Sequence, residues 1–504
     1  MSASYYDVVV MGMELGPLTA GALLARRGFR VLVVGQKGAF DSYSCFGYSF
    51  LRRPFVLTAS HSPVIRRVIE ELTLGQLFQH VLHNPKINYQ VVLKDARIDV
   101  YGDLKRTEKE IAREIPSAAQ SAGAVLQEIG RLNGEFEKLL SNDLVIPPES
   151  FFERREFARA EVQNPFYMAP KTDVFKKLNI SGTLRNFLEA PVKLETAGIN
   201  PSGPLACVRQ MGAWMFDCQN VQNGRDGLRK LLCDRIIGQG GDVLHSQSVT
   251  EILVGRGKVR AVRMEDREEP TSCQVVLTDL SPKELAPFIA PNLWPKRFVA
   301  QVEDATESRL AYGINLAVDS RVVPAAMAQT VIVFLGSGFG ADLFRVELVK
   351  QKDPSKAVFH VSCNVAPNDN DAIVSGALRD ALLDRMRWLV PFLDSHLKVV
   401  HSCYDGFGSM DLTGEAKGDA PAAPRPEEVP KWLVQQPLSS SALGVENMPH
   451  RTGIKGLLLA GSQVVSGIST EGEMLAAWGA ARIAGKMDPG RQRLVRSMRA
   501  KIEN

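Results

Sequence analysis

The strongest constraint on how this chain folds lies in its first 36 residues. Val8–Met11 and Val31–Val34 are short apolar runs rich in β-branched residues, and Leu18–Arg26 between them is rich in Ala and Leu at helical spacing. A strand, a helix and a strand within about 30 residues have the length of one mononucleotide-binding half. The pattern predicts an α/β fold that begins with a Rossmann-like parallel sheet and its helices.

The turn after the first strand departs from the sequence that usually binds a diphosphate. In a G-x-G-x-x-G register Gly12 is the first glycine, but Glu14 replaces the second and Pro17 the third, with Gly16 between them. Glycines there let the backbone approach the phosphates, and the helix N-terminus favours their negative charge. Two like charges about 4 Å apart repel by roughly 4 kcal/mol at an effective dielectric of about 20. Four arginines are candidates to compensate the charge of Glu14: Arg26, Arg27, Arg52 and Arg53.

The end of the second strand lacks the acid that would accept hydrogen bonds from ribose hydroxyls. Gly35 stands there, and Gln36 is left as a neutral substitute. Pro17 lacks a backbone N–H but suits the first turn of a helix, so it weakens the anion site more than the fold.

Length, charge and cysteine usage exclude several classes of protein. A chain of 504 residues predicts two domains or one domain split by insertions. The formal net charge of +4 is close to neutral for this length, which speaks against nucleic acid as a partner. The seven cysteines are scattered with no C-x-x-C pair, as in a reduced cytosolic protein. No apolar run reaches the roughly 18 residues of a spanning helix, and the first strand leaves no room for a signal peptide, so we expect a cytoplasmic protein.

Hydrophobic periodicity and turn residues predict further helices and strands along the chain. Expected helices are an amphipathic one at Arg66–Leu82, a largely helical stretch at Lys105–Leu140, one that ends at Gly238, and two more at Asp371–Leu389 and Glu473–Lys486. Expected strands are Gln90–Leu93, Ala96–Val100, Val243–His245, Val249–Val254, Val259–Met264, Gln274–Thr278, Val331–Phe334, Leu343–Val349, Val358–Val365 and Leu457–Gly461.

Three blocks, far apart and in this order, carry a resemblance to a known family. They are the N-terminal unit, the stretch Gln222–Ile252 with its glycine-led helix and Gly-Gly turn, and GLLLAGSQVVSGISTEGEMLAAWGAARIAG from Gly456. The sequence resembles the flavin-dependent phytoene desaturase and amine oxidase group, whose fold is shared by the Rab GDP-dissociation inhibitors. The resemblance implies an FAD-binding domain interleaved with an α+β substrate domain.

The resemblance also divides the chain. It implies FAD-binding-like segments at 1–105, 216–290 and 451–488. A helical part of the substrate domain lies at 106–215, the sheet and helix of that domain at 291–450 with a loop at 413–428, and a basic C-terminal helix at 489–504.

The implied cofactor is FAD, with its binding weakened or lost. The cofactor contacts implied are Gly12, Gly16, Gln36, Val249, Gly461 and Ser462, together with Glu14 in the phosphate path and Glu473 and Met474 at the start of a helix that faces the flavin. Asp41-Ser42 stands where the family usually has Gly-Gly, and Ser462 where it often has Asp. The departures all lie along the path of one ligand.

Two functions from different classes follow from the resemblance. The first is an FAD-dependent oxidoreductase acting on a hydrophobic, polyene or isoprenoid-like substrate, in which the flavin performs the chemistry and no catalytic residue can be named. The second is a cofactor-free pseudoenzyme that binds a lipid or a protein partner. The sequence does not determine the oligomeric state.

Weaker motifs have ordinary explanations. His80 and His83 lie at i, i+3 without a third ligand at useful spacing, so we expect a surface pair and no metal. Gly336–Gly340 indicates a hairpin turn, and Ser439–Ser441 a polar loop. A C-terminal helix with Leu494 and Met498 among basic residues could touch anionic lipid, although a solvated terminal helix is the simpler interpretation.

Overall fold

The β-strands of the first sheet come from three distant parts of the chain. The computed structural model describes residues 5–38, 40–163, 175, 180, 182–196, 204–304, 306–336, 340–366, 376–405, 410–411, 433–435 and 448–487. Five parallel strands lie in the order β10 (Asp242–Leu244), β2 (Val31–Val34), β1 (Val8–Met11), β14 (Val275–Thr278) and β22 (Leu457–Leu459). The predicted Rossmann-like sheet is therefore present, and each expected strand is found to within a residue or two.

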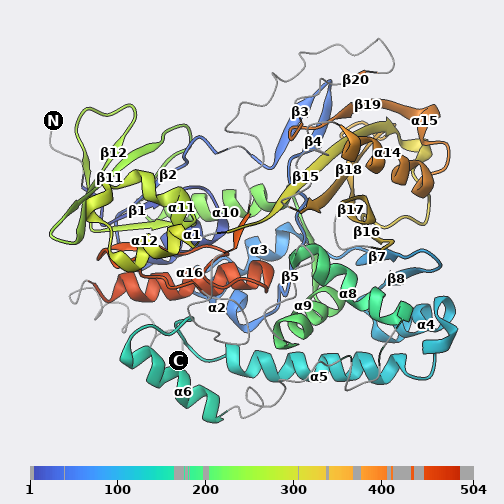
Figure 1. Ribbon diagram of the computed structural model, residues 1–504, viewed down its shortest axis with the longest axis horizontal. Coiled ribbons are helices and arrows are strands. Elements are labelled where there is room, and N and C mark those ends of the chain that lie inside the picture. The colour runs from blue at the N-terminus through green and yellow to red at the C-terminus, as the bar shows by residue number, and fades with distance from the viewer. Residues whose placement is uncertain are drawn as a thin grey trace.

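Three helices pack on or beside this sheet, on the left of Figure 1. They are α1 (Leu15–Arg26), α10 (Gly224–Gly238) and α16 (Ser469–Gly485). α1 is buried on nearly every side because its Ala, Gly and Leu residues let α16 and α10 approach it closely. A small sheet of β11 (Val249–Gly255), β12 (Lys258–Met264) and β13 (Thr271–Ser272) lies at the outer end, with α11 (Pro282–Leu285) and α12 (Lys296–Glu303) nearby.

A nine-stranded mixed sheet forms the second part of the molecule. Its order is β20 (Met410–Asp411), β19 (Leu397–His401), β15 (Thr306–Asp319), β18 (Lys356–Val365), β17 (Leu343–Lys350), β16 (Thr330–Phe334), β7 (Tyr89–Val92) and β8 (Arg97–Val100), with β21 (Leu433–Gln435) beside β15. β7 and β8 form the expected hairpin, and so do β16 and β17. β7 and β8 belong to this sheet although their residues fall within the predicted FAD-binding-like segment 1–105. The domain boundaries themselves stay a prediction.

Helices cover both faces of the nine-stranded sheet. α14 (Ala377–Leu389) packs on one face with the short α15 (Leu393–His396) beside it. On the other side lie α4 (Leu104–Glu114), α5 (Ala122–Leu140), α8 (Gly182–Thr196) and α9 (Pro204–Phe216), at the lower right of Figure 1. The hairpin of β3 (Ser42–Cys45) and β4 (Tyr48–Leu51) packs against β15 and β18, and β9 (Cys218–Val221) joins β5 (Leu57–Thr58) to β6 (Leu82–His83).

Two helix predictions are corrected. The single helix expected at Arg66–Leu82 is two, α2 (Pro63–Glu71) and α3 (Gly75–Val81), because Thr73 between them adopts a left-handed conformation with φ of 55°. α16 begins at Ser469, four residues before the predicted start. α6 (Phe151–Gln163) lies at an outer corner of the molecule below α16 (Figure 1).

Some predictions fall outside the described residues. These are the loop at 413–428, Ser439–Ser441, the basic helix at 489–504, and the centre of Gly336–Gly340.

Candidate functional site

Glu14 lies in the turn between β1 and α1, where its backbone is extended and its carboxylate does not cap the helix. Glu14 Oε1 accepts hydrogen bonds from Arg53 Nη2 at 2.8 Å and Arg229 Nη2 at 2.7 Å. Its other oxygen, Oε2, accepts from Arg225 Nη1 at 3.0 Å. Three guanidinium groups therefore hold the carboxylate that the sequence placed in the phosphate path.

The sequence identified only one of these three partners. Arg53 was among the four arginines put forward, whereas Arg27 binds Glu71 at 2.6 Å and Arg52 lies over the ring of Tyr43. Arg26 makes no bond to Glu14 within the described part of the chain. Arg225 and Arg229 were missed, since they come more than 200 residues later. Their i, i+4 spacing at the start of α10 was the available signal.

Further carboxylates complete an acid–base cluster around Glu14. Arg53 Nε donates to Asp41 at 2.8 Å, Arg229 Nη1 to Asp226 at 2.9 Å, and Arg225 Nη1 to Glu473 at 3.1 Å. Among the described residues, the cluster joins three guanidiniums to four carboxylates and carries one net negative charge. It has no spare positive charge to offer a diphosphate.

The electrostatics of the cluster favour the ionised forms. Burial by itself would raise the pKa of Glu14, but the charges of Arg53, Arg225 and Arg229 outweigh it and hold that pKa well below its usual range. Burial opposes the charge on Arg225 as well, yet the neighbouring Glu473 and Glu14 raise its pKa. At neutral pH Glu14 is a fully charged, fully paired carboxylate.

Asp279 faces this turn from the end of β14. It was not among the site residues predicted from the sequence. Burial raises the pKa of Asp279 to about 7, and the negative charge of Glu14 adds to the effect. Its Oδ1 lies 3.1 Å from the place that a Cβ on Gly12 would occupy. An acid that directly follows a strand of the parallel sheet was the signal that could have found it.

The side chain of Gln36 occupies the main-chain groups of Val249. Gln36 Oε1 accepts from Val249 N at 2.5 Å, and Gln36 Nε2 donates to Val249 O at 3.4 Å. Both residues are among the cofactor contacts that the resemblance implies. The structure thus brings together two predicted site residues, but their hydrogen-bonding groups bind each other.

Close packing explains the glycines in these turns without a ligand. A Cβ on Gly16 would overlap the carbonyl oxygen of Ala460, and one on Gly461 would lie 2.5 Å from Cβ of Asp279. Gly12 has a φ of 107°, which favours glycine. At Gly35 a Cβ would overlap the carbonyl oxygen of His245, so no acid fits at the ribose position.

The remaining predicted site residues are spread out. Ser462 is exposed after β22. Glu473 joins the cluster through Arg225, while Met474 is buried against α1, where Thr19 Oγ1 donates to its sulfur at 3.4 Å. Because α16 begins at Ser469, both residues lie in its second turn and not at its N-terminus.

A row of buried polar side chains crosses the nine-stranded sheet on the face opposite α14. His401, Asn315, His360, Glu347 and Thr330 lie in register on neighbouring strands. Asn315 Oδ1 is 3.1 Å from His360 Nδ1 and can only accept, so Nδ1 carries the proton. His360 Nε2 is buried without a hydrogen-bond partner in the described structure, and burial lowers the pKa of this ring to about 3. The interior face is therefore partly polar and holds a neutral imidazole.

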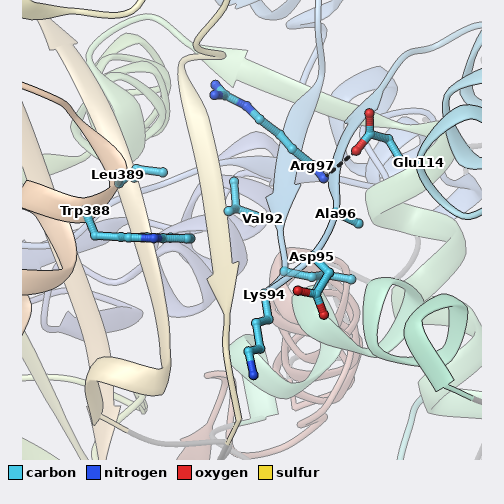
Figure 2. Close-up of a pocket in the computed structure, with 9 residues that line it drawn as sticks. Val92, Lys94, Asp95, Ala96, Arg97, Glu114, Trp388 and Leu389 are labelled. Carbon is cyan, nitrogen blue, oxygen red and sulfur yellow. Dashed lines mark hydrogen bonds between the residues drawn. The ribbon is translucent and has the colours of Figure 1, made fainter.

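Other surface features carry less chemistry. A pocket of about 410 Å³ opens between the β7–β8 turn, with Lys94 and Asp95, and the end of α14, with Trp388 and Leu389 (Figure 2). His80 and His83 are exposed, and the described residues contain no group of three side chains suited to a metal ion. Within the same residues, every helix is too short or too polar to cross a bilayer.

No protein-family model matches the sequence. Prolycopene isomerases 1 and 2, both chloroplastic and from an Oncidium hybrid cultivar, are each 23% identical over 283 residues, which cover 53% of this chain and 47% of theirs. The chain thus spans about half the length of the curated relatives it matches.

Solved structures match over nearly the whole chain. An oxidoreductase from Methanosarcina mazei is 15% identical with a TM-score of 0.56, covering 94% of this chain and 98% of the other. Cyclohexylamine oxidase from Brevibacterium oxydans is 13% identical with a TM-score of 0.54, covering 96% of this chain and 99% of the other. Rab GDI from Plasmodium falciparum is 10% identical with a TM-score of 0.50, covering 80% of this chain and 90% of the other. This chain has the FAD-linked oxidoreductase fold. Amine oxidases and Rab GDI share it, as the resemblance predicted.

We call the positions where this fold would hold a dinucleotide, Gly12–Gly16, Gly35, Gln36 and Val249, the dinucleotide groove. With their side chains as they stand, these residues do not fit a dinucleotide. The phosphate turn holds a paired carboxylate within a cluster of net negative charge, the ribose position admits no acid, and the Val249 groups are bonded to Gln36. The contacts at Glu14 and at Val249 would each require a rearrangement, and the contact with the ribose lacks its acid.

Proposed function

We propose that this chain is a flavin-free member of the fold that acts by binding a partner and not by redox chemistry. The single observation that carries the proposal is the Glu14 carboxylate locked by Arg53, Arg225 and Arg229 in the phosphate turn. A diphosphate would have to displace a carboxylate that already accepts a hydrogen bond from each of the three guanidiniums. The bond between Gln36 and Val249 supports the same conclusion at the other end of the groove.

Flavin binding by the full chain tests the proposal. We expect the purified protein to lack visible flavin absorption and to show no heat of binding when titrated with FAD. Stoichiometric flavin in the purified protein, or saturable binding in the titration, would overturn the proposal.

Two variants test whether Glu14 is what prevents a diphosphate from binding. Glu14→Gly removes the carboxylate that the three guanidiniums share, and with it the net negative charge of the cluster. We expect affinity for inorganic pyrophosphate to rise at least tenfold, since removing a repulsion of roughly 4 kcal/mol corresponds to as much as about a thousandfold. Glu71→Gln removes a carboxylate that binds Arg27 at the other end of α1 and serves as the matched control. Equal pyrophosphate binding by both variants would mean that Glu14 is not what closes the groove.

A second candidate function is an FAD-dependent oxidoreductase on a hydrophobic, polyene or isoprenoid-like substrate. It is supported by the similarity to prolycopene isomerases and by the match to oxidoreductase structures over nearly the whole chain. Flavin in the purified protein would favour this candidate.

A further inference from the structure

α6 is anchored to the body of the protein through one narrow face. Glu153, Phe157 and Ala160 are buried, and they lie on one side of the helix at i, i+4 and i+7. Glu153 accepts two hydrogen bonds from Arg451, at 2.7 and 3.1 Å. The position and rotation of the helix are therefore fixed by contacts on this side.

The opposite side carries large apolar residues in full view of solvent. Phe151, Phe152 and Val162 are 74%, 71% and 81% exposed. The two phenylalanine rings contact each other edge to face, with centroids 5.7 Å apart. We define the outer face of α6 as the exposed residues Phe151, Phe152, Arg154, Arg155, Ala158, Arg159 and Val162.

The charges on the outer face are all positive. Arg154, Arg155 and Arg159 are exposed, whereas the acids of the helix point elsewhere. Glu153 is buried against Arg451, and Glu156 lies 3.4 Å from Arg482 of α16. Glu161 is half-buried at the margin. Within the described part of the chain no ion pair holds these three arginines. Adjacent aromatic rings among such cations are the composition of a helix that rests on an anionic membrane surface.

We propose that the outer face of α6 docks on a bilayer containing anionic phospholipid. The two phenylalanines enter the boundary between headgroups and acyl chains, and the three arginines bind lipid phosphates and carboxylates. An anionic lipid surface matches the uniform sign of the charge and needs no shape complementarity to two protruding rings. This inference rests on the proposed function in that it names the partner of a binding protein, and it concerns an element remote from the dinucleotide groove.

Vesicle co-sedimentation of the full chain tests the inference. We expect binding to vesicles of phosphatidylcholine with phosphatidylserine, little binding to phosphatidylcholine alone, and weakening as salt rises. Phe151→Ala with Phe152→Ala should lower the partition coefficient at least tenfold. Replacing the three arginines by Gln should lower it about fivefold per residue, whereas replacing them by Lys should preserve it.

Phe392→Ala is the matched control, because Phe392 is 80% exposed beside α15, away from α6. Circular dichroism checks that each variant is folded. Failure of the full chain to bind acidic vesicles, or binding by both α6 variants that equals that of Phe392→Ala, would overturn the inference. So would a dimer broken by the phenylalanine variants without vesicle binding. The FAD titration is a separate measurement, so a chain that takes up flavin yet binds vesicles through α6 would reject the proposed function alone.

Discussion

Glu14 shows how the neighbours of a side chain decide its effect at a helix N-terminus. The same carboxylate that would repel a phosphate is, in the folded protein, the centre of a paired cluster. Its three partners come from the segment after β4 and from α10, so the cluster ties the N-terminal unit to a helix more than 200 residues away. The residue that departs from the nucleotide motif thereby links the turn after β1 to α10.

Glu14→Gln should destabilise the protein by about 2–4 kcal/mol, because the buried Arg225 and Arg229 would each lose one carboxylate partner. Urea denaturation gives the free energy of unfolding. Glu251→Gln, which breaks an exposed pair with Arg263, should cost less than about 1 kcal/mol. Similar losses for both variants would contradict a central role for Glu14.

Asp279 should make stability fall as pH rises through about 7. Its pKa in the folded protein is above the unfolded value, so its contribution is fully present below the unfolded pKa and is lost as pH rises through the folded pKa. Asp279→Asn removes this titration, and we expect the variant to gain stability over the wild type between about pH 6 and pH 8. Urea midpoints at both pH values measure the difference, and a constant difference would refute the assignment.

At the scale of elements, α16 is held at its first turn by one buried ion pair. Arg209 of α9 donates to both oxygens of Glu471 at 2.7 Å, and the two side chains are 3% and 1% exposed. Arg209 also bonds Asn133 and Glu137 of α5. This arrangement fixes the end of α16 against the helices that cover the nine-stranded sheet.

Glu471→Gln should cost about 3–5 kcal/mol, because it leaves the Arg209 charge buried with one partner fewer. We expect faster hydrogen exchange in the first turn of α16 and unchanged exchange in α1. Glu135→Gln, from an exposed pair with Lys138, is the control and should cost less than about 1 kcal/mol. Uniform acceleration across the protein would show that the pair does not act locally.

At the scale of the whole molecule, acid and base should each lower stability. The pKa of Glu153 is lowered to about 2: burial opposes the shift, and the hydrogen bond from Arg451 outweighs it. Its contribution is present above its ordinary pKa near 4.5 and is lost as pH falls toward 2. Asp279 acts in the opposite direction as pH rises toward 7. Melting temperatures should therefore be highest at about pH 4, because the Glu153 contribution is complete above about 4.5 and the Asp279 contribution is lost from about 4 to 7. A steady rise from there to pH 8 would contradict this account.

Local sequence patterns predicted much of the fold because strands and helices reflect residues close together in the chain. Val8–Met11 and Val31–Val34 are strands as expected, and the α10 helix and the β7–β8 hairpin are where periodicity placed them. The break at Thr73 and the early start of α16 were missed, since both depend on how the chain packs.

The sequence by itself determined that a carboxylate enters the phosphate turn and that Gly35 replaces the ribose acid. Only the tertiary structure decided that Arg225 and Arg229 neutralise Glu14, that Gln36 bonds Val249, and that His245 leaves no room at Gly35. The physical reason is that ion pairs and hydrogen bonds act over a few ångströms in space, and the groups that meet here come together only when α10, β11 and the parallel sheet have packed.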